Sequence, residues 1–138
     1  MEREIKEIKL FMEPKTYPIF EEILSNAGNV EVFYVQDLKI STNCVEEESW
    51  ILTEKVLIQF YINGLDDITK VEATTFHRDA IIGIKRSYEI EKKNQGMEYI
   101  TSLKSASIHF NDGREPIIIK NPEDEEQKWF IKLVNMLG

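Results

Sequence analysis

The amino-acid sequence predicts an α+β fold that is mostly β, with a helix near the N-terminus, seven antiparallel strands and a C-terminal amphipathic helix. Three observations support this fold class. Apolar residues recur at every second position through much of residues 30–120, which is the period of a half-buried strand. Turn-forming residues interrupt this alternation at short intervals, which favours antiparallel hairpins. After Pro122 the apolar spacing changes to the three and four residues of a helix.

The segment 14–27 is expected to form the first helix. Its apolar residues fall on one stripe at helical spacing: Tyr17, Phe20, Ile23, Leu24 and Ala27. Gly28 follows and is expected to end the helix in the left-handed conformation. Residues 1–12 keep neither period for long, so we interpret residues 1–29 as an N-terminal extension that contains one helix.

The strands are expected where apolar residues alternate with a period of two. Arg86 is the one residue that interrupts the series of apolar residues on the inner face of its strand. The seven ranges are 30–40, 50–53, 56–62, 68–75, 80–90, 99–110 and 116–120. Asn63-Gly64 is expected to close the third strand, because both residues tolerate a positive φ. A bulge near Gly83, or a place at the rim of the sheet, would explain Arg86. Asn111-Asp112-Gly113 gives the strongest hairpin signal.

The last helix is expected to begin after Asn121, which would cap it, with Pro122 at its first position. Acidic residues 123–126 would lie beside the positive end of the helix dipole. The buried stripe is Trp129, Phe130, Leu133, Val134 and Leu137.

Residues 30–138 resemble a pleckstrin-homology-like (PH-like) barrel. The resemblance rests on seven antiparallel strands followed by a helix with the aromatic anchor Trp129-Phe130. The stretch 50–62 followed by Ile68-Thr69-Lys70-Val71 is also similar to the aromatic-rich strand pair and I-x-x-V strand of bacterial members. The chain is further similar to short bacterial proteins without a characterised function. The resemblance implies a single domain, 1–138, whose seven-stranded barrel is closed at one end by the C-terminal helix.

Charge and composition argue against several classes of partner. The chain of 138 residues has a formal net charge of −8, which repels polyphosphate, so no nucleic-acid partner is expected. No apolar run approaches the roughly 20 residues of a bilayer span, so no membrane insertion is expected. PH-like proteins that bind phosphoinositides carry cations near the loop between the first two strands. Glu46-Glu47-Glu48 stands there instead, and a phosphoinositide ligand is therefore disfavoured.

The residues that could carry catalysis are few. Cys44 is the only cysteine, which excludes an intramolecular disulfide, fits a reducing compartment and favours a cytoplasmic location. His77 is close to Asp79 in sequence, but a turn is the simpler interpretation, and His109 is expected to face solvent. Asp66-Asp67 is expected to be a solvated acidic pair. No metal, cofactor or catalytic residue is predicted, and an enzymatic role is disfavoured without being excluded.

Residues 68–121 form the one cationic part of the chain, with 9 basic and 7 acidic side chains. Its densest cations are the candidate binding residues Arg78, Lys85, Arg86, Lys92 and Lys93. The leading hypothesis is a small intracellular, non-enzymatic PH-like interaction module. Its partner would be a protein or peptide that meets this cationic strip or pairs with a strand edge. A homo-oligomer is a further option.

The competing hypothesis is a small-molecule-binding or enzymatic α+β domain. Its apolar pocket would lie near His77, Trp50 and Tyr61, under the first helix. The aromatic pairs Phe33-Tyr34 and Phe60-Tyr61 bear on both hypotheses. One member of each pair is expected to be exposed, and the first helix is expected to cover part of this surface.

Overall fold

The structure, a computed structural model, describes residues 14–93, 96 and 98–138. The expectation for residues 1–12 lies outside the described residues. The chain forms two compact units, one ending at Asp79 and the other beginning at Ala80. Whether 1–138 behaves as one domain stays a prediction.

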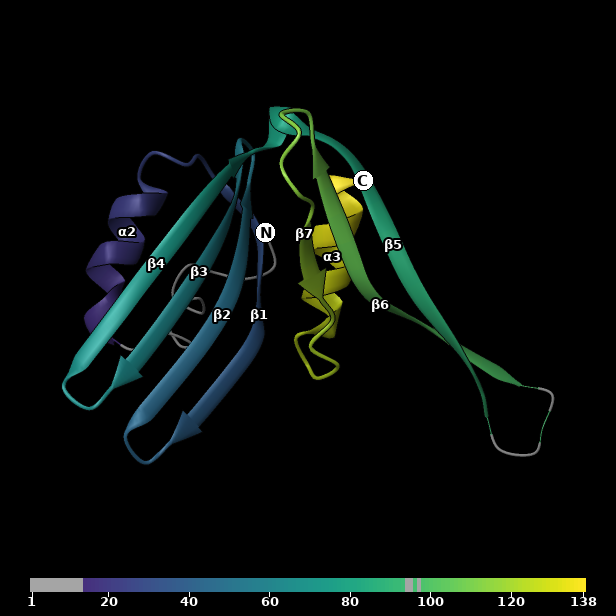
Figure 1. The fold of residues 1–138 in the computed structure, drawn as a ribbon, viewed down its shortest axis with the longest axis horizontal. Helices are drawn as coiled ribbons and strands as arrows, with labels where there is room; N and C mark the ends of the chain where they lie inside the picture. Colours follow the sequence, from purple (N-terminus) through teal and green to yellow (C-terminus); the bar gives the residue numbers. More distant parts are fainter. Residues whose placement is uncertain (1–13, 94–95, 97) are drawn as a thin grey trace. The chain divides into compact units, whose positions relative to one another are not determined.

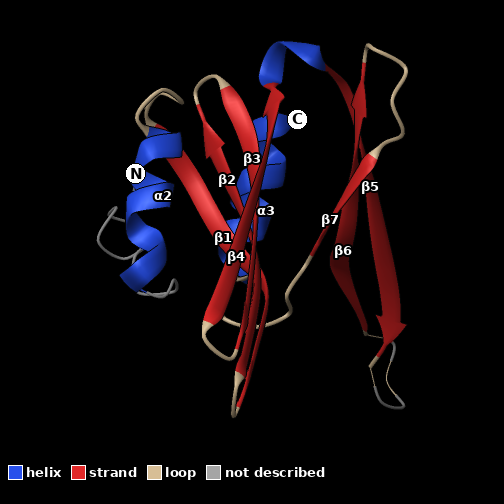
Figure 2. Cartoon of the chain, turned by 60° about the vertical axis from the view of Figure 1, so that its left-hand side comes forward, coloured by secondary structure: helices blue, strands red, loops and turns tan. Residues whose placement is uncertain are grey.

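The first unit is a four-stranded antiparallel sheet with a helix on one face (Figures 1 and 2). Its elements are η1 (Pro14–Thr16), α2 (Tyr17–Leu24), β1 (Val30–Ser41), β2 (Cys44–Thr53), β3 (Val56–Leu65) and β4 (Ile68–His77). The strands lie in the order β1-β2-β3-β4, so each strand pairs with the next one along the chain. Gly28 ends the helical region with φ +86°, as the sequence predicts.

Alternation along β1, β2 and β3 divides the apolar residues of this sheet between its two faces. Phe33, Ile51, Ile58 and Phe60 point to the α2 face, where the ring of Phe20 lies 5.1 Å from that of Phe60. The side chains between them point to the opposite face, and the large ones there are buried as well: Val32, Tyr34, Trp50, Leu52 and Leu57. The first sheet therefore buries both of its faces, at about 1.5–3 kcal/mol for each large aliphatic side chain.

The second unit is a three-stranded antiparallel sheet followed by a helix. Its elements are β5 (Ile81–Lys92), β6 (Tyr99–Phe110), β7 (Ile117–Lys120) and α3 (Gln127–Leu137), and the short helix η2 (Arg78–Ala80) precedes β5. The strand β7 pairs only with residues 105–108 of β6. Beyond that point β5 and β6 continue together as a two-stranded ribbon (Figure 1).

Seven antiparallel strands and a C-terminal helix are confirmed, but the expected closed barrel is wrong. Among the described residues, the strands form two separate sheets of four and three strands. The chain turns through η2 between β4 and β5, so these two strands do not continue as a hairpin. The hydrogen-bond ladder of the first sheet ends at β4, and that of the second begins at β5.

Three local expectations also need correction. The last helix begins at Gln127, because Glu123 has a left-handed φ of +62° and Asn121 Oδ1 accepts a hydrogen bond from the Glu123 N–H at 2.8 Å. The third strand continues through Asn63-Gly64, and the chain turns at Asp66, whose φ is +56°. The second strand, expected over 50–53, already begins at Cys44.

The expected irregularity near Gly83 is confirmed. The ladder between β5 and β6 shifts register between Ile81 and Gly83, so Ile82 is an extra residue on β5. From Gly83 to Lys92 the strand has no further extra residue, because the second shift places Lys104 of β6 out of register. Ala106, Ile108 and Phe110 of β6 are buried, as their alternation predicts.

Candidate functional site

The candidate site is one face of the β5–β6 ribbon. Register pairs Tyr88 with Leu103, Ile90 with Thr101 and Lys92 with Tyr99, so these side chains share a face. Tyr88 is 56%, Ile90 70% and Tyr99 64% exposed. We call the residues Tyr88, Ile90, Lys92, Tyr99 and Thr101 the ribbon face. An exposed group of large apolar side chains on a two-stranded ribbon is typical of a surface that meets another protein.

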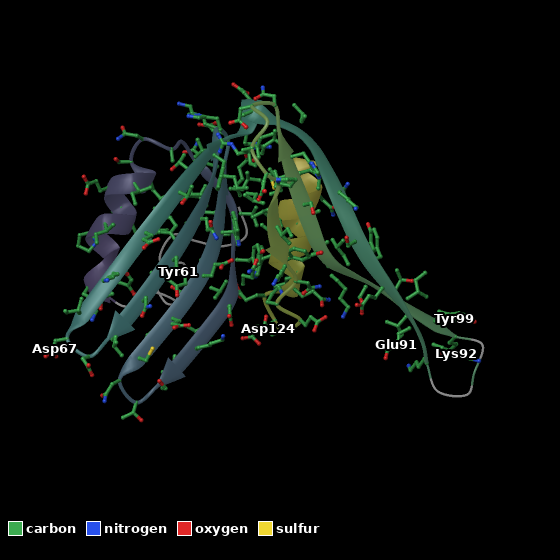
Figure 3. All side chains as sticks on the ribbon, in the orientation of Figure 1. Tyr61, Asp67, Glu91, Lys92, Tyr99 and Asp124 are labelled. Carbon is green, nitrogen blue, oxygen red and sulfur yellow. The ribbon has the colours of Figure 1, made fainter. Side chains whose placement is uncertain are left out.

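The local sequence explains why this surface forms and why it stays exposed. Alternating β-branched and aromatic residues favour extended strands on both sides of the ribbon. The last residue of β7, Lys120, pairs with Ser105, so no described strand continues along residues 99–103 of β6. Tyr99 and Lys92 lie together near the end of the ribbon, and Glu91 lies beside them (Figure 3). Apolar side chains on this end therefore lack the third strand that would bury them.

The opposite side of the ribbon is mostly polar, with Ile100, which is 48% exposed, as its one large apolar residue. Glu89 and Glu91 alternate with the apolar residues of β5 and are exposed. Lys104 forms an ion pair with Glu123, and its Nζ lies 3.8 Å from Glu89 Oε2. The hydrogen bond that Lys104 donates to Glu123, together with the negative charges of Glu123, Glu89 and Glu91, raises the pKa of Lys104 above its ordinary value. The ribbon thus has one mainly apolar face and one charged face.

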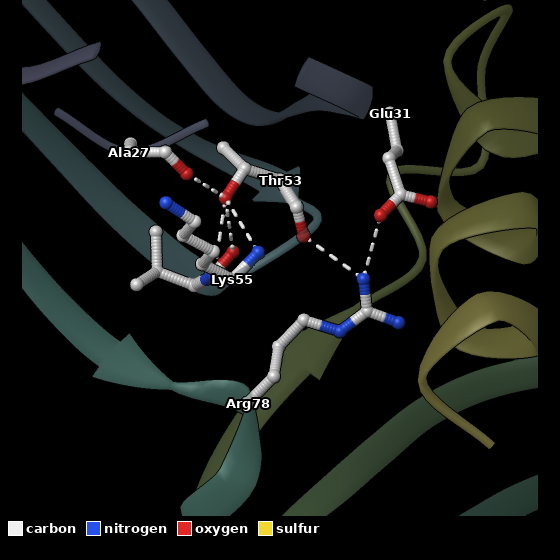
Figure 4. Close-up of polar contacts among 6 residues, drawn as sticks. Ala27, Glu31, Thr53, Lys55 and Arg78 are labelled. Carbon is white, nitrogen blue, oxygen red and sulfur yellow. Dashed lines mark hydrogen bonds and ion pairs between the residues drawn. The ribbon is translucent and has the colours of Figure 1, made fainter. Parts of the chain in front are cut away.

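Arg78 is held inside the first unit, away from the other predicted cations along the chain. Its Nη1 donates to Glu31 Oε1 at 2.7 Å and to the carbonyl of Thr53 at 2.9 Å (Figure 4). Arg78 and Glu31 are both largely shielded from solvent. Thr53, in turn, donates from Oγ1 to the carbonyl of Ala27 at 2.5 Å. These contacts give Arg78 a structural role in joining β1, the β2–β3 turn and the end of β4.

The four remaining cations lie on or just after β5 without forming a patch. Lys85 and Arg86 are neighbours on a strand, so their side chains point to opposite faces. Arg86 is half-buried, and its guanidinium lies close to Gly138. The space is so tight that a Cβ added to Gly138 would lie 3.1 Å from Arg86 Cζ. Lys92 lies seven residues from Lys85, roughly 24 Å along the strand, and Lys93 follows it. That these cations bind a partner stays a prediction.

The structure does not bring His77, Trp50 and Tyr61 together. Trp50 pairs with Gln59, and Tyr61 pairs with Glu48, so Trp50 and Tyr61 share the face opposite α2. His77 pairs with Val56, a residue of the core under α2, and is exposed. The pocket of the competing hypothesis therefore lacks its histidine.

The sequence analysis missed a polar network on the same face. The register shift in β1 between Val35 and Asp37 places Gln36 out of the ladder. Its Oε1 accepts hydrogen bonds from Tyr34 Oη and Trp50 Nε1, both at 3.1 Å, and its Nε2 donates to Glu48 at 2.7 Å. The network satisfies the polar ends of two buried aromatic residues. The break in alternation at Gln36 was the one available signal.

The aromatic pairs are more buried than expected. Phe33 and Phe60 belong to the core under α2, which confirms that the first helix covers this surface. Tyr34, however, is fully buried and Tyr61 is half-buried, so the expectation of one exposed member in each pair is wrong. These aromatics contribute to the core and are unsuited to partner binding.

The three consecutive glutamates expected in the loop between the first two strands lie on a strand instead. Glu46, Glu47 and Glu48 lie on β2, and Glu47 is 2% exposed, so the loop between the first two strands is shorter than predicted.

A hollow of about 460 Å³ borders the β3–β4 turn at Asp66 and Asp67. Its remaining lining residues are Asn63, Leu65, Ile68 and Lys70. Two of the four are exposed apolar residues of a hairpin end.

The residue types that could hold a metal do not converge. In the part of the chain that the structure describes, no three histidine, cysteine or acidic side chains gather to hold a metal ion. His109 is half-buried and pairs with Gly83 on β5. Cys44 is a free, half-buried thiol. Among residues 14–93, 96 and 98–138, no helix has the length and apolar character needed to cross a bilayer.

Comparison with protein-family models, curated proteins and solved structures finds no match.

Proposed function

We propose that the chain is a non-enzymatic, PH-like protein-interaction module that acts inside the cell and binds a protein through the β5–β6 ribbon. The carrying observation is the exposure of Tyr88, Ile90 and Tyr99 on one face of a ribbon with only two strands. Large aromatic side chains contribute most where they become buried at an interface. A protein surface that covers the ribbon face would bury all three together.

Three further features support the proposal. Seven antiparallel strands followed by α3, on which Phe130 is fully buried, fit the PH-like order of elements. The single, free Cys44 fits a reducing compartment such as the cytoplasm. The ribbon face also carries Lys92, and a positive charge beside aromatic residues favours a protein partner with acidic and apolar groups.

Site-specific photo-crosslinking tests this function. A photoreactive phenylalanine derivative replaces Tyr99 in one variant and Lys55, an exposed residue of the β2–β3 turn, in a control variant. Irradiation in extract of the cells that make the protein is followed by mass spectrometry of the adducts. We expect a defined protein adduct at position 99 and none at position 55. Equal labelling at the two positions, or no protein adduct at 99, contradicts the proposal.

A matched pair of substitutions shows whether the apolar contacts matter. We expect Tyr99→Ser to reduce the yield of a protein adduct formed from position 88. Ile68→Ser, which removes an equally exposed apolar residue from β4, should leave the yield unchanged. If both substitutions reduce the yield alike, the ribbon face has no special role.

A further inference from the structure

The outer edge of β5 is an unpaired strand edge. This strand has twelve residues and pairs with β6 on one side, and no described strand pairs with its other side. It contains no proline, and none of its residues is buried. Every second N–H and C=O group on this side is therefore available to another strand. Such an edge is a template for adding a strand by backbone hydrogen bonds.

The charges of β5 are arranged for pairing with an identical strand. Lys85 and Arg86 lie in its first half, whereas Glu89 and Glu91 lie in its second half, before Lys92 at its end. Antiparallel pairing of two such strands can place Lys85 of each copy opposite a glutamate of the other. Opposite charges directly across a ladder are favourable, and like charges are unfavourable.

We propose that the occupant of this edge is a second copy of the chain, paired antiparallel to β5 with Ser87 opposite Ser87 of the second copy. This inference goes beyond the proposed function, because the second copy pairs with the backbone edge of β5 and does not cover the ribbon face. The register sets Lys85 opposite Glu89 of the second copy twice in the dimer. It also sets Ile84 opposite Ile90 twice. The segment 83–91 can pair throughout, since β5 has no extra residue after Gly83.

Other registers are less favourable. Directly opposed residues must share a face of the sheet, so only registers centred on a residue are possible. Centring on Arg86 or on Glu89 opposes two like charges at the dimer axis. Centring on Tyr88 pairs Lys85 with Glu91 but sets Ile84 opposite Lys92. Only the register centred on Ser87 matches both the charges and the apolar residues.

The proposed pairing also explains how the exposed residues of the strand would be distributed. Ile84, Arg86, Tyr88 and Ile90 share one face, where each Tyr88 would lie opposite Arg86 of the second copy. An arginine beside a tyrosine ring is a favourable contact. Lys85, Ser87 and Glu89 share the other face, where Lys85 of each copy would form an ion pair with Glu89 of the other. The result is a six-stranded sheet, continuous across the two copies.

Charge reversal and its compensation test the proposal with the purified full chain. Sedimentation velocity measures the dimer dissociation constant from micromolar to submillimolar protein. We expect Lys85→Glu and Glu89→Lys each to weaken dimerisation about tenfold or more, because each creates two like-charge pairs. The double variant should return to within about threefold of the unmodified protein. Lys55→Glu, the matched control, should have no effect.

Two further readouts complete the test. Amide hydrogen exchange within 83–91 should slow as protein concentration rises, because the second copy protects the edge. If Glu91→Lys restores the dimerisation of the Lys85→Glu variant and Glu89→Lys does not, the proposed register is contradicted. A protein that stays monomeric throughout contradicts the inference. If position 99 still crosslinks to a different protein, the proposed function survives that failure, whereas loss of every protein adduct removes both.

Discussion

The two sheets of this protein use strands of similar length and similar alternation with opposite results. The strand β3 buries six of its ten residues, whereas β5 buries none of its twelve. β3 has a strand on each side and faces α2 with its core residues, whereas β6 is the one described strand that pairs with β5. The difference shows that alternation prepares a strand for burial, but its neighbours decide how much is buried. The exposed sheet is therefore the better place to look for a partner.

The largest expected effect compares the same residue type in the two sheets. Ile58→Ala should lower the free energy of unfolding by about 2–5 kcal/mol, because it leaves a cavity in the core under α2. Ile90→Ala, in the ribbon face, should change it by less than about 0.5 kcal/mol at protein concentrations where the chain is monomeric. Urea denaturation of both variants measures the difference. Equal losses would abolish the contrast between the sheets.

A second prediction concerns the polar contacts that connect α2 to the first sheet. Thr53 is fully buried, and its Oγ1 also accepts from the N–H of Val56 at 3.0 Å. Thr53→Val should cost about 1–3 kcal/mol, because it leaves buried groups without hydrogen-bond partners. Thr75→Val, at an exposed position of β4, should be nearly neutral. Thermal unfolding checks both, and a similar midpoint for the two variants would contradict a role for the Thr53 hydroxyl.

A third prediction separates Arg78 from the other cations. Arg78→Gln should destabilise the protein by about 1–2 kcal/mol, since the Glu31 carboxylate loses a charged donor in a partly buried site. Combining it with Glu31→Gln in a double-mutant cycle should show coupling of at least about 0.5 kcal/mol. Lys85→Gln, by contrast, should leave the stability of the monomer unchanged. Additive losses for Arg78 and Glu31 would mean that their ion pair contributes nothing.

The smallest effect lies in the β6–β7 turn. Hydrogen bonds from the side chain and backbone N–H of Arg114 hold the pKa of Asp112 below its ordinary value of 3.8. Because the pKa is lowered in the folded state, the stabilisation is present above 3.8 and is lost as pH falls through the lower value. NMR titration of the Asp112 carboxyl should show this, and Arg114→Gln should return the pKa toward 3.8. An unchanged pKa in that variant would contradict the assigned cause.

Local signals in the sequence identified most elements but misplaced several of their ends. The alternation of Val56, Ile58 and Phe60 located β3, and the helical spacing of Tyr17 and Phe20 located α2. The cap expected at Asn121 was wrong, because the same side chain can form a local turn with the Glu123 N–H. Asn63-Gly64 can form a turn but does not require one, and pairing with β4 extends β3 through these two residues to Leu65. Such errors arise where two local structures compete and long-range pairing selects one.

The site residues were harder to predict for a related reason. Tyr34 and Tyr88 both fall on the apolar period of two of a strand, yet one is fully buried and the other is 56% exposed. Nothing local indicates that Arg78 bonds to Glu31 across 47 positions, whereas Lys85 is exposed on a strand. Charge density along the chain therefore grouped cations that the fold places in different surroundings.

The sequence by itself determined the periods, the number of strands, the residues that must be apolar and the net charge, because these depend on residue types and their spacing. The tertiary structure decided that the strands form two sheets, that β7 ends before the tip of the ribbon and that no described strand pairs with the outer edge of β5. Strand pairing depends on which segments meet in space. The period of the apolar residues does not specify which segments pair.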